Sequence, residues 1–428
     1  MNAAQVTRLF AVTRPLRQAP PLLLHADARN PLLWLRGDRG CVGVGEVLRL
    51  SFRGEDRFAE AAAAWRGIAA AATVDDPLGR PGSGLVAFGT FAFDDRSASE
   101  SVLVVPRLLI ARHGDSAWVT EVSTEPIERP VQSAIETMDN PRRLPMVRPR
   151  GAWPGARLDT LAPDEAYLSG VSEATAIIER GEVEKVVLAR SVRSSIGEQD
   201  DLRIPLGRLA YRYTDCWTYA VDGMIGASPE TLVRQTGGTI TARVLAGTRG
   251  RHDEAATDER MRDELLSSRK EQHEHAFAVQ SVVTALAPHV RELRTSEEPF
   301  ALELPNVWHL ATDLEAVPGD GASSLELVDA LHPTAAVAGT PTREAVEAIA
   351  RLEPFDRGRY AGAVGWIDAA GDGEWVIALR GAQIGEPEDG RRSVTAYAGG
   401  GIVAGSDPAH ELRETVSKFK PIAEALAP

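Results

Sequence analysis

The stretch at residues 396–420, AYAGGGIVAGSDPAHELRETVSKFK, contains the clearest change of local structure in this chain. A strand-like run ends in three glycines at 399–401. Asp407 followed by Pro408 is typical of a helix N-cap and its first turn. We therefore predict a strand, a glycine-rich turn and a helix. The turn would offer backbone N–H groups to an anion.

The predicted helix carries charged residues at spacings that place them on one face. Glu411 and Glu414 are three residues apart, and Lys418 is four residues beyond Glu414. Two carboxylates and an ammonium beside N–H groups suit an anionic ligand held together with a hard cation. An ordinary turn and a solvated amphipathic helix would produce the same pattern. The choice therefore depends on partners elsewhere in the chain.

The composition excludes several classes of function. The chain has 428 residues, of which 43% are hydrophobic, so it can bury a large core. Its formal net charge of −14 argues against nucleic acid or an anionic membrane as the main partner. Cys41 and Cys216 are the only cysteines, too few for a disulfide framework. We find no leader peptide and no apolar run of roughly 20 residues, and expect a soluble cytoplasmic protein.

Lysine is scarce in this sequence. Lysine and arginine together number 47, but lysine occurs only at 185, 270, 418 and 420. Of these two residue types, only lysine loses its proton at accessible cost and can act as a base. Each lysine is therefore a candidate for chemistry, with chance codon usage as the alternative.

The first 150 residues read as short strands and turns with a few helices. We predict a hairpin at 31–52, a helix at 57–72 and one strand each in 82–95 and 101–114. Residues 138–154 are rich in proline and arginine and lack apolar periodicity. They resemble a surface connection between two parts of the chain.

The second part contains more signals. Apolar residues at helical spacing run to Gly181, and a strand follows at 184–195, which places Lys185 at its start. Residues 255–294 read as one long amphipathic helix. Within it, Glu271, Glu274 and His275 share a face.

Two pairs of acidic residues suggest a metal site. Glu271 with Glu274, and Glu411 with Glu414, have the same spacing on two predicted helices. All-oxygen coordination with open water positions suits Mg²⁺. His273 and His275 are two residues apart and do not converge as helical zinc ligands would. Two solvated acidic faces remain the alternative.

The order of ten motifs resembles the chorismate-utilising enzymes, and among them the isochorismate synthases, over about residues 165–425. The motifs are EKVVLAR, ASPETL, LAGTRGR, KEQHEH, WHLAT, LHPTAAVAG, YAGAVGW, GEWVIALR, AGGGIV and ELRETVSK. The resemblance implies an α/β (α+β) fold: two large, mainly antiparallel sheets packed together, with helices outside and the active site between them. Residues 1–150, which match weakly, would complete a single unit with the catalytic region at 151–428.

The resemblance also implies the site residues. Glu274 and Glu414 would bind Mg²⁺, with Glu271 and Glu411 holding its waters, and the ion would grip the ring carboxylate of chorismate. The remaining substrate contacts would come from Gly247, Thr248, His309, Tyr360, Arg380, Gly400 and Lys418. Tyr360 departs from the pattern, because some isochorismate synthases carry another aromatic residue there.

The expected reaction adds water at C2 of chorismate and expels the C4 hydroxyl, which requires a base and an acid. Lys185 resembles the base and Glu230 the acid. Ala246 replaces the nucleophilic lysine of aminodeoxychorismate synthases. Because water rather than ammonia reacts, no glutaminase subunit is needed, and we expect a monomer. Use of the product in menaquinone, siderophore or salicylate synthesis stays open.

Two other functions compete with this interpretation. A salicylate synthase would form the same intermediate and then eliminate pyruvate. Ala336 and Val337 resemble the isochorismate-releasing type, whereas salicylate synthases tend to have Thr then Ala there. A non-catalytic relative would bind a small aromatic acid, but it would be expected to have lost part of the base, acid and carboxylate set.

Overall fold

The computed structural model describes residues 7–128, 153–252, 254–303 and 307–428, without the side chain of Lys270. Most of the predicted connection at 138–154 lies outside the described residues. Among those described, no helix is both long enough and apolar enough to cross a bilayer.

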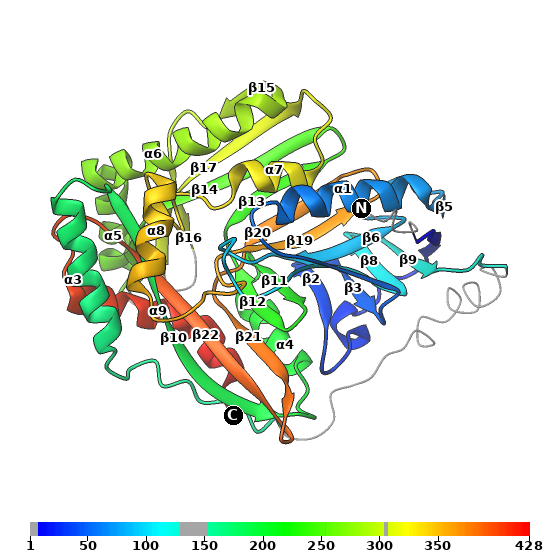
Figure 1. Ribbon diagram of the computed structural model, residues 1–428, viewed down its shortest axis with the longest axis horizontal. Coiled ribbons are helices and arrows are strands. Elements are labelled where there is room, and N and C mark those ends of the chain that lie inside the picture. The colour runs from blue at the N-terminus through cyan, green and yellow to red at the C-terminus, as the bar shows by residue number, and fades with distance from the viewer. Residues whose placement is uncertain (1–6, 129–152, 253, 304–306) are drawn as a thin grey trace.

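Two large sheets dominate the structure (Figure 1). The described strands of the first sheet number twelve, and their spatial order is β18 (Gly339–Thr340), β10 (Lys185–Gly197), β22 (Arg391–Ile402), β21 (Gly381–Glu388), β12 (Met224–Ser228), β11 (Trp217–Val221), β2 (Leu32–Arg36), β3 (Arg39–Val44), β8 (Leu108–His113), β9 (Ser116–Ser123), β1 (Phe10–Leu16) and β5 (Thr73–Asp75). Every pairing in it is antiparallel except β1 with β5.

The second sheet is antiparallel throughout its described part. Its order is β15 (Val290–Thr295), β17 (Val307–Pro318), β14 (Thr239–Gly250), β13 (Thr231–Thr236), β20 (Gly373–Ile377), β19 (Ala363–Asp368), β6 (Val86–Thr90), β7 (Ser101–Val105) and β4 (Leu48–Phe52), with β16 (Phe300–Glu303) also paired to β17. Both sheets contain strands from before and after residue 150, joined by β2 with β11 and by β6 with β19.

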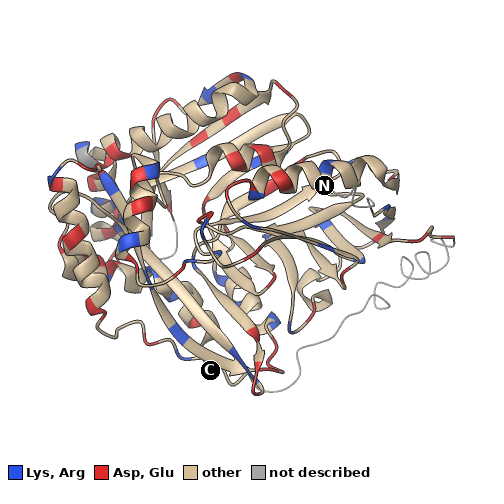
Figure 2. Ribbon diagram, in the orientation of Figure 1, with Lys and Arg blue, Asp and Glu red and all other residues tan. Residues whose placement is uncertain are grey.

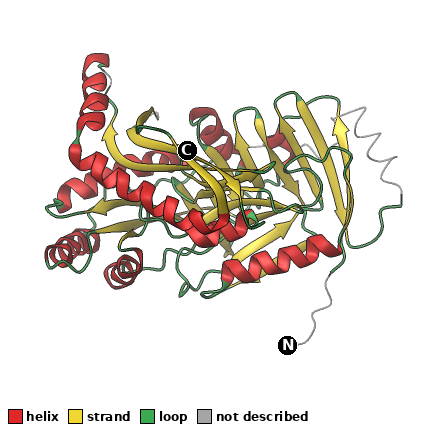
Figure 3. Cartoon of the chain, turned by 90° about the horizontal axis from the view of Figure 1, so that it is seen from above, coloured by secondary structure: helices red, strands yellow, loops and turns green. Residues whose placement is uncertain are grey.

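Helices lie along the outside of the strands (Figure 3). They are α1 (Arg57–Ala71), α3 (Glu165–Glu179), α4 (Arg203–Arg212), α5 (Ala255–Ser267), α6 (Arg269–Leu286), α7 (Ser324–Leu331), α8 (Thr342–Leu352) and α9 (Pro408–Leu426), with short 3₁₀ turns η1 (Leu22–His25) and η3 (Ala287–His289). Helix α1 packs against α7, and α9 packs against α3 and α4. Charged residues are frequent on the helices, whereas the central strands carry few (Figure 2). This arrangement confirms the predicted fold class.

Two expectations about elements outside the stretch at 396–420 were wrong. The single helix predicted at 255–294 is two helices, because Ser268 leaves the helical conformation and its side chain accepts the Glu271 N–H as an N-cap. A short 3₁₀ turn and strand β15 then replace the predicted end of that helix. The single strand predicted in 101–114 is β7 and β8, which join different sheets on either side of Pro106.

The core of the second sheet contains a buried tryptophan. Trp375 is fully buried, packs edge-on against Phe91 with ring centroids 5.7 Å apart, and donates its indole N–H to Ser324 at 3.1 Å. A methyl group on Gly89 would approach the Trp375 ring to 2.6 Å. The glycine therefore makes room for the indole between neighbouring strands.

Replacement of Trp375 with alanine should lower the free energy of unfolding by about 3–5 kcal/mol, because it leaves a large cavity and an unpaired Ser324. Denaturant unfolding measures this loss. The control is Tyr211→Ala on α4, whose side chain is 85% exposed and should change stability by less than about 0.5 kcal/mol. Equal stabilities for the two variants would contradict the packing described.

Candidate functional site

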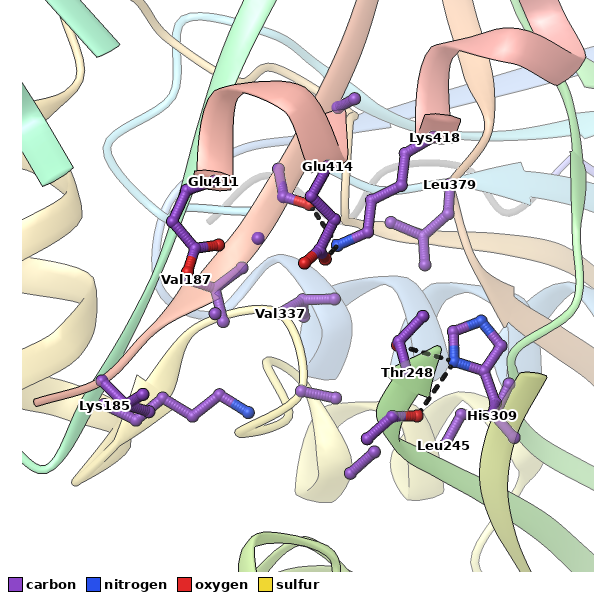
Figure 4. A pocket seen from close by; sticks show the side chains of 18 of the residues that line it. Lys185, Val187, Leu245, Thr248, His309, Val337, Leu379, Glu411, Glu414 and Lys418 are labelled. Atoms are coloured by element: carbon purple, nitrogen blue, oxygen red, sulfur yellow. Dashed lines mark hydrogen bonds and ion pairs between the residues drawn. The ribbon is translucent and has the colours of Figure 1, made fainter. Parts of the chain in front are cut away.

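A cavity of about 580 Å³ lies between the two sheets. Strands β10 and β22 of the first sheet, β14 and β17 of the second, and helices α6 and α9 contribute to its walls. All of the predicted site residues line it: Lys185, Glu230, Gly247, Thr248, Glu271, Glu274, His309, Tyr360, Arg380, Gly400, Glu411, Glu414 and Lys418. Residues far apart in sequence therefore meet in one place (Figure 4).

The three consecutive glycines form the wall beneath two of these side chains. They were predicted as a turn, but they are part of β22 and pair with β10. A methyl group on Gly401 would lie 2.7 Å from Lys185 Cε, and one on Gly400 would lie 3.2 Å from Glu411 Oε2. One on Gly399 would collide with the Leu188 carbonyl. The missing side chains thus leave space for the reactive groups.

Lys185 is the first residue of β10, as predicted. Burial lowers the pKa of its ammonium, and the charge of Lys418 acts in the same direction. Glu274, Glu271 and Glu230 oppose this change without cancelling it. A lowered pKa makes the neutral, proton-accepting form of this lysine easier to reach.

Glu230 follows β12 in a turn that is fixed by Ser228. The Ser228 hydroxyl donates to the Ile377 carbonyl at 2.6 Å and accepts the Glu230 N–H at 3.3 Å. Burial raises the pKa of Glu230 to about 7, although the cations of Arg380, Lys185 and Lys418 lower it. The carboxyl group therefore keeps a proton in weakly acidic solution.

Arg380 has no hydrogen bond or ion pair through its guanidinium group within the described part of the chain. Its backbone is left-handed, with φ of 52°, a conformation that costs energy for a residue with a side chain. Burial lowers its pKa, and Tyr360 and Glu414 oppose this change without cancelling it. Such a cation on a cavity wall is suited to bind an anionic ligand.

Tyr360 lies beside Arg380 on the cavity wall. Its ring stacks on Tyr397, with centroids 5.0 Å apart and an interplanar angle of 13°. Burial raises the pKa of Tyr360 to about 12, so its hydroxyl stays neutral and can donate a hydrogen bond.

Helix α9 begins as predicted, with the Asp407 side chain accepting the His410 N–H at 2.7 Å. Lys418 pairs with Glu414 at 2.6 Å and donates to the Gly399 carbonyl at 2.7 Å. Burial acts to raise the pKa of Glu414, but Lys418 together with His410 and Arg380 outweighs it, and the net pKa is lowered. Burial and the neighbouring Glu414 raise the pKa of Glu411.

One possible ligand atom from each of His410, Glu411 and Glu414 lies within 4.8 Å of the others. Among described residues, no other group of three or more such side chains meets this spacing. Glu271 and Glu274 line the same cavity from α6. The donor set is rich in carboxylate oxygens and fits a hard divalent cation.

Helix α6 is anchored so that its acidic residues border the cavity. His275 is buried, with its ring nitrogens 3.2 Å from the Ala246 carbonyl and 2.7 Å from the Thr312 hydroxyl. Gly247 has φ of 85°, and a methyl group there would approach Glu271 Oε2 to 2.9 Å. His275 is therefore a structural contact beneath the Gly247 segment, while Glu271 and Glu274 lie at the cavity.

His309 and Thr248 are opposite each other on β17 and β14. The Thr248 hydroxyl is 3.0 Å from His309 Nδ1, which is also 3.3 Å from the Gly247 carbonyl. Burial lowers the pKa of His309 to about 3, with Arg380 and Lys418 acting in the same direction. The imidazole is therefore neutral at physiological pH and serves as a hydrogen-bonding group.

Several cavity residues were not identified from the sequence, among them Arg357, Tyr397 and His410. The spacing of His410 and Glu414, four apart on one helix, could have indicated a pair of ligands. Tyr397 lies in the stretch at residues 396–420, but no motif in that stretch marks it as a site residue. Arg357 depends on contacts that no local pattern reveals.

Comparison with known proteins gives consistent results. Residues 2–427 match the family described as "Chorismate binding enzyme". Isochorismate synthase DhbC of Bacillus subtilis is 41% identical over 274 residues, covering 61% of this chain and 68% of the relative. The salicylate biosynthesis isochorismate synthase of Pseudomonas aeruginosa is 33% identical, covering 94% and 86%. The structure of MenF, the menaquinone-specific isochorismate synthase of Escherichia coli, superimposes with a TM-score of 0.76 at 26% identity, covering 98% and 94%.

The Glu230 carboxyl group should titrate with a midpoint of about 7. The Arg380→Met variant should raise this midpoint further, because the nearby cation with the largest effect in favour of the carboxylate is removed. Carbon NMR of labelled glutamate measures it. Lys420→Met removes an exposed charge from α9 and should leave the midpoint unchanged. A lower midpoint in Arg380→Met would contradict the electrostatic arrangement.

Proposed function

Because this chain belongs to the chorismate-binding enzyme family, we propose that it is an isochorismate synthase, which interconverts chorismate and isochorismate. The observation that carries this proposal is the pairing of Lys185, whose pKa is lowered, with Glu230, whose pKa is raised, on the walls of one cavity. The reaction requires a base and an acid, and burial shifts the pKa of each residue toward the protonation state that its role needs.

Each of the two residues would carry out one of the two proton transfers. Neutral Lys185 would take a proton from water as the water oxygen bonds to C2 of chorismate. Protonated Glu230 would give its proton to the C4 oxygen as the C4–O bond breaks and water departs. The ring double bonds shift between these carbons, so the product is an isomer of the substrate. Exchange with solvent restores both groups.

The other cavity residues would bind and orient the substrate. Arg380 is available for a carboxylate, with the Tyr360 hydroxyl as a neutral donor beside it. Lys418, already held by Glu414 and the Gly399 carbonyl, would add a fixed positive charge. Thr248 and neutral His309 would present hydrogen-bonding groups near the ring without adding charge.

We further propose that Glu274 and Glu414 hold Mg²⁺, with Glu271 and Glu411 binding its waters. The carboxylate-rich donor set on α6 and α9 supports this assignment. When bound, the ion would neutralise the acidic side chains and the ring carboxylate of chorismate, and fix that carboxylate in place.

The proposal includes a monomer in the cytoplasm, acting without a glutaminase subunit. Two observations support it. Cys41 and Cys216 are both buried free thiols, as expected in a reducing compartment. The large exposed apolar side chains of the described chain are scattered over separate elements: Val74, Leu161, Tyr211, Phe277 and Val317.

The purified protein should convert chorismate to isochorismate without releasing pyruvate, and EDTA should abolish turnover until Mg²⁺ is restored. Separation of the products and a pyruvate assay measure this. Release of pyruvate with salicylate would instead assign a salicylate synthase and overturn the inference from Ala336 and Val337. No reaction with chorismate would contradict the proposed function.

Lys185→Ala should lower kcat at least about a hundredfold while chorismate still binds, because the base acts in the transition state rather than in ground-state binding. Steady-state kinetics and calorimetric titration with chorismate measure the two effects. Lys420→Ala serves as the control for loss of an exposed lysine. Unchanged turnover in Lys185→Ala would remove this residue from the mechanism.

A further inference from the structure

We propose that Arg357, held by Glu353, is a positioning residue that fixes the strand of Lys185 against the cavity wall at Val337. The inference rests on the proposed isochorismate synthase function. The guanidinium group of Arg357 lies on the wall of the cavity and is almost completely buried, with the whole residue 4% exposed.

Glu353 orients the guanidinium group through two parallel contacts. Arg357 Nε donates to Glu353 Oε2 at 2.9 Å, and Nη2 donates to Oε1 at 2.6 Å. Glu353 Oε1 also accepts the backbone N–H of Ala189 in β10 at 2.7 Å. This bidentate geometry leaves little rotational freedom, and it ties the pair directly to the strand that begins at Lys185.

The remaining donors of Arg357 join two backbone segments. Nη2 donates to the Val187 carbonyl at 2.6 Å, and Nη1 donates to the Val337 carbonyl at 3.0 Å. Val187 is two residues after Lys185, and its own N–H donates to the Ala338 carbonyl at 2.8 Å. One side chain thus bridges the base-bearing strand and the neighbouring segment at Val337, adding to the direct backbone bond between them.

The same guanidinium group also lies over two aromatic rings. Its carbon is 4.4 Å from the centre of the Phe93 ring and 6.0 Å from that of Tyr360. Arg357 therefore contacts a third part of the wall, where Tyr360 stands beside the substrate space. A planar group with several donors can serve these neighbours simultaneously, whereas a lysine ammonium cannot.

Stability alone does not account for this pair. Both side chains are only 3% exposed, and a buried ion pair often adds no more stability than apolar residues of similar size. Unlike apolar residues, the pair fixes the direction in which Arg357 donates hydrogen bonds to the Val187 and Val337 carbonyls. The role we assign is therefore geometric.

The first test is Arg357→Lys in the full-length protein. It keeps the charge beside Glu353 but cannot reproduce both carbonyl contacts. We expect kcat for isochorismate formation to fall about tenfold to a hundredfold, since small displacements of a catalytic group cost this much, with KM within about threefold. Arg343→Lys is the control, because Arg343 forms an exposed pair with Glu347 at the same four-residue separation.

The second test separates geometry from stability. The double variant Glu353→Met/Arg357→Met removes both charges and avoids leaving one buried alone. We expect it to regain most of the melting temperature lost in Arg357→Met, while kcat remains low. Recovery of kcat together with melting temperature, or an Arg357→Lys enzyme within twofold of wild-type turnover, would overturn the positioning role. A wild-type protein without isochorismate formation would overturn the proposed function as well.

Discussion

The close approach of side chains to the backbone of β22 is the constraint on which the cavity depends. Lys185 and Glu411 occupy the space over Gly401 and Gly400, where any other residue would place a Cβ. At the same time these glycines keep the ladder with β10 intact, so the wall stays a regular strand. The sheet can therefore be both continuous and hollowed at one place.

The balance of charges in the cavity follows from that confined space. Burial disfavours the charged forms of Lys185 and Glu230, so it lowers the pKa of one and raises that of the other. Glu271 and Glu274 of α6 moderate the change in the pKa of Lys185, and the cations of Arg380 and Lys418 moderate the change in the pKa of Glu230. The same burial that makes the acid and the base reactive also leaves Arg380 without a partner in the described chain, ready for the charge of the substrate.

Features that depend on neighbouring residues could be predicted from the sequence, whereas features that depend on contacts between distant segments could not. The Asp407 cap, the start of β10 at Lys185 and the acidic pairs are short-range patterns, and the order of motifs predicted the two-sheet fold. The break at Ser268 was missed because a capping serine inside a helical pattern looks like a helix residue. The glycines at 399–401 looked like a turn because their role depends on Lys185 and Glu411 above them. Contacts between distant segments, such as Arg357 with Val187, have no local signal.

The order of strands in the first sheet has a consequence for synthesis of the chain on the ribosome. Strand β10 lies between β18 and β22, but β22 begins only at Arg391, far downstream in the sequence. Until β22 is synthesised, the strand that bears Lys185 exposes unpaired backbone edges, a condition that favours association with other chains. The nascent chain therefore cannot complete the sheet around Lys185 until β22 has left the ribosome.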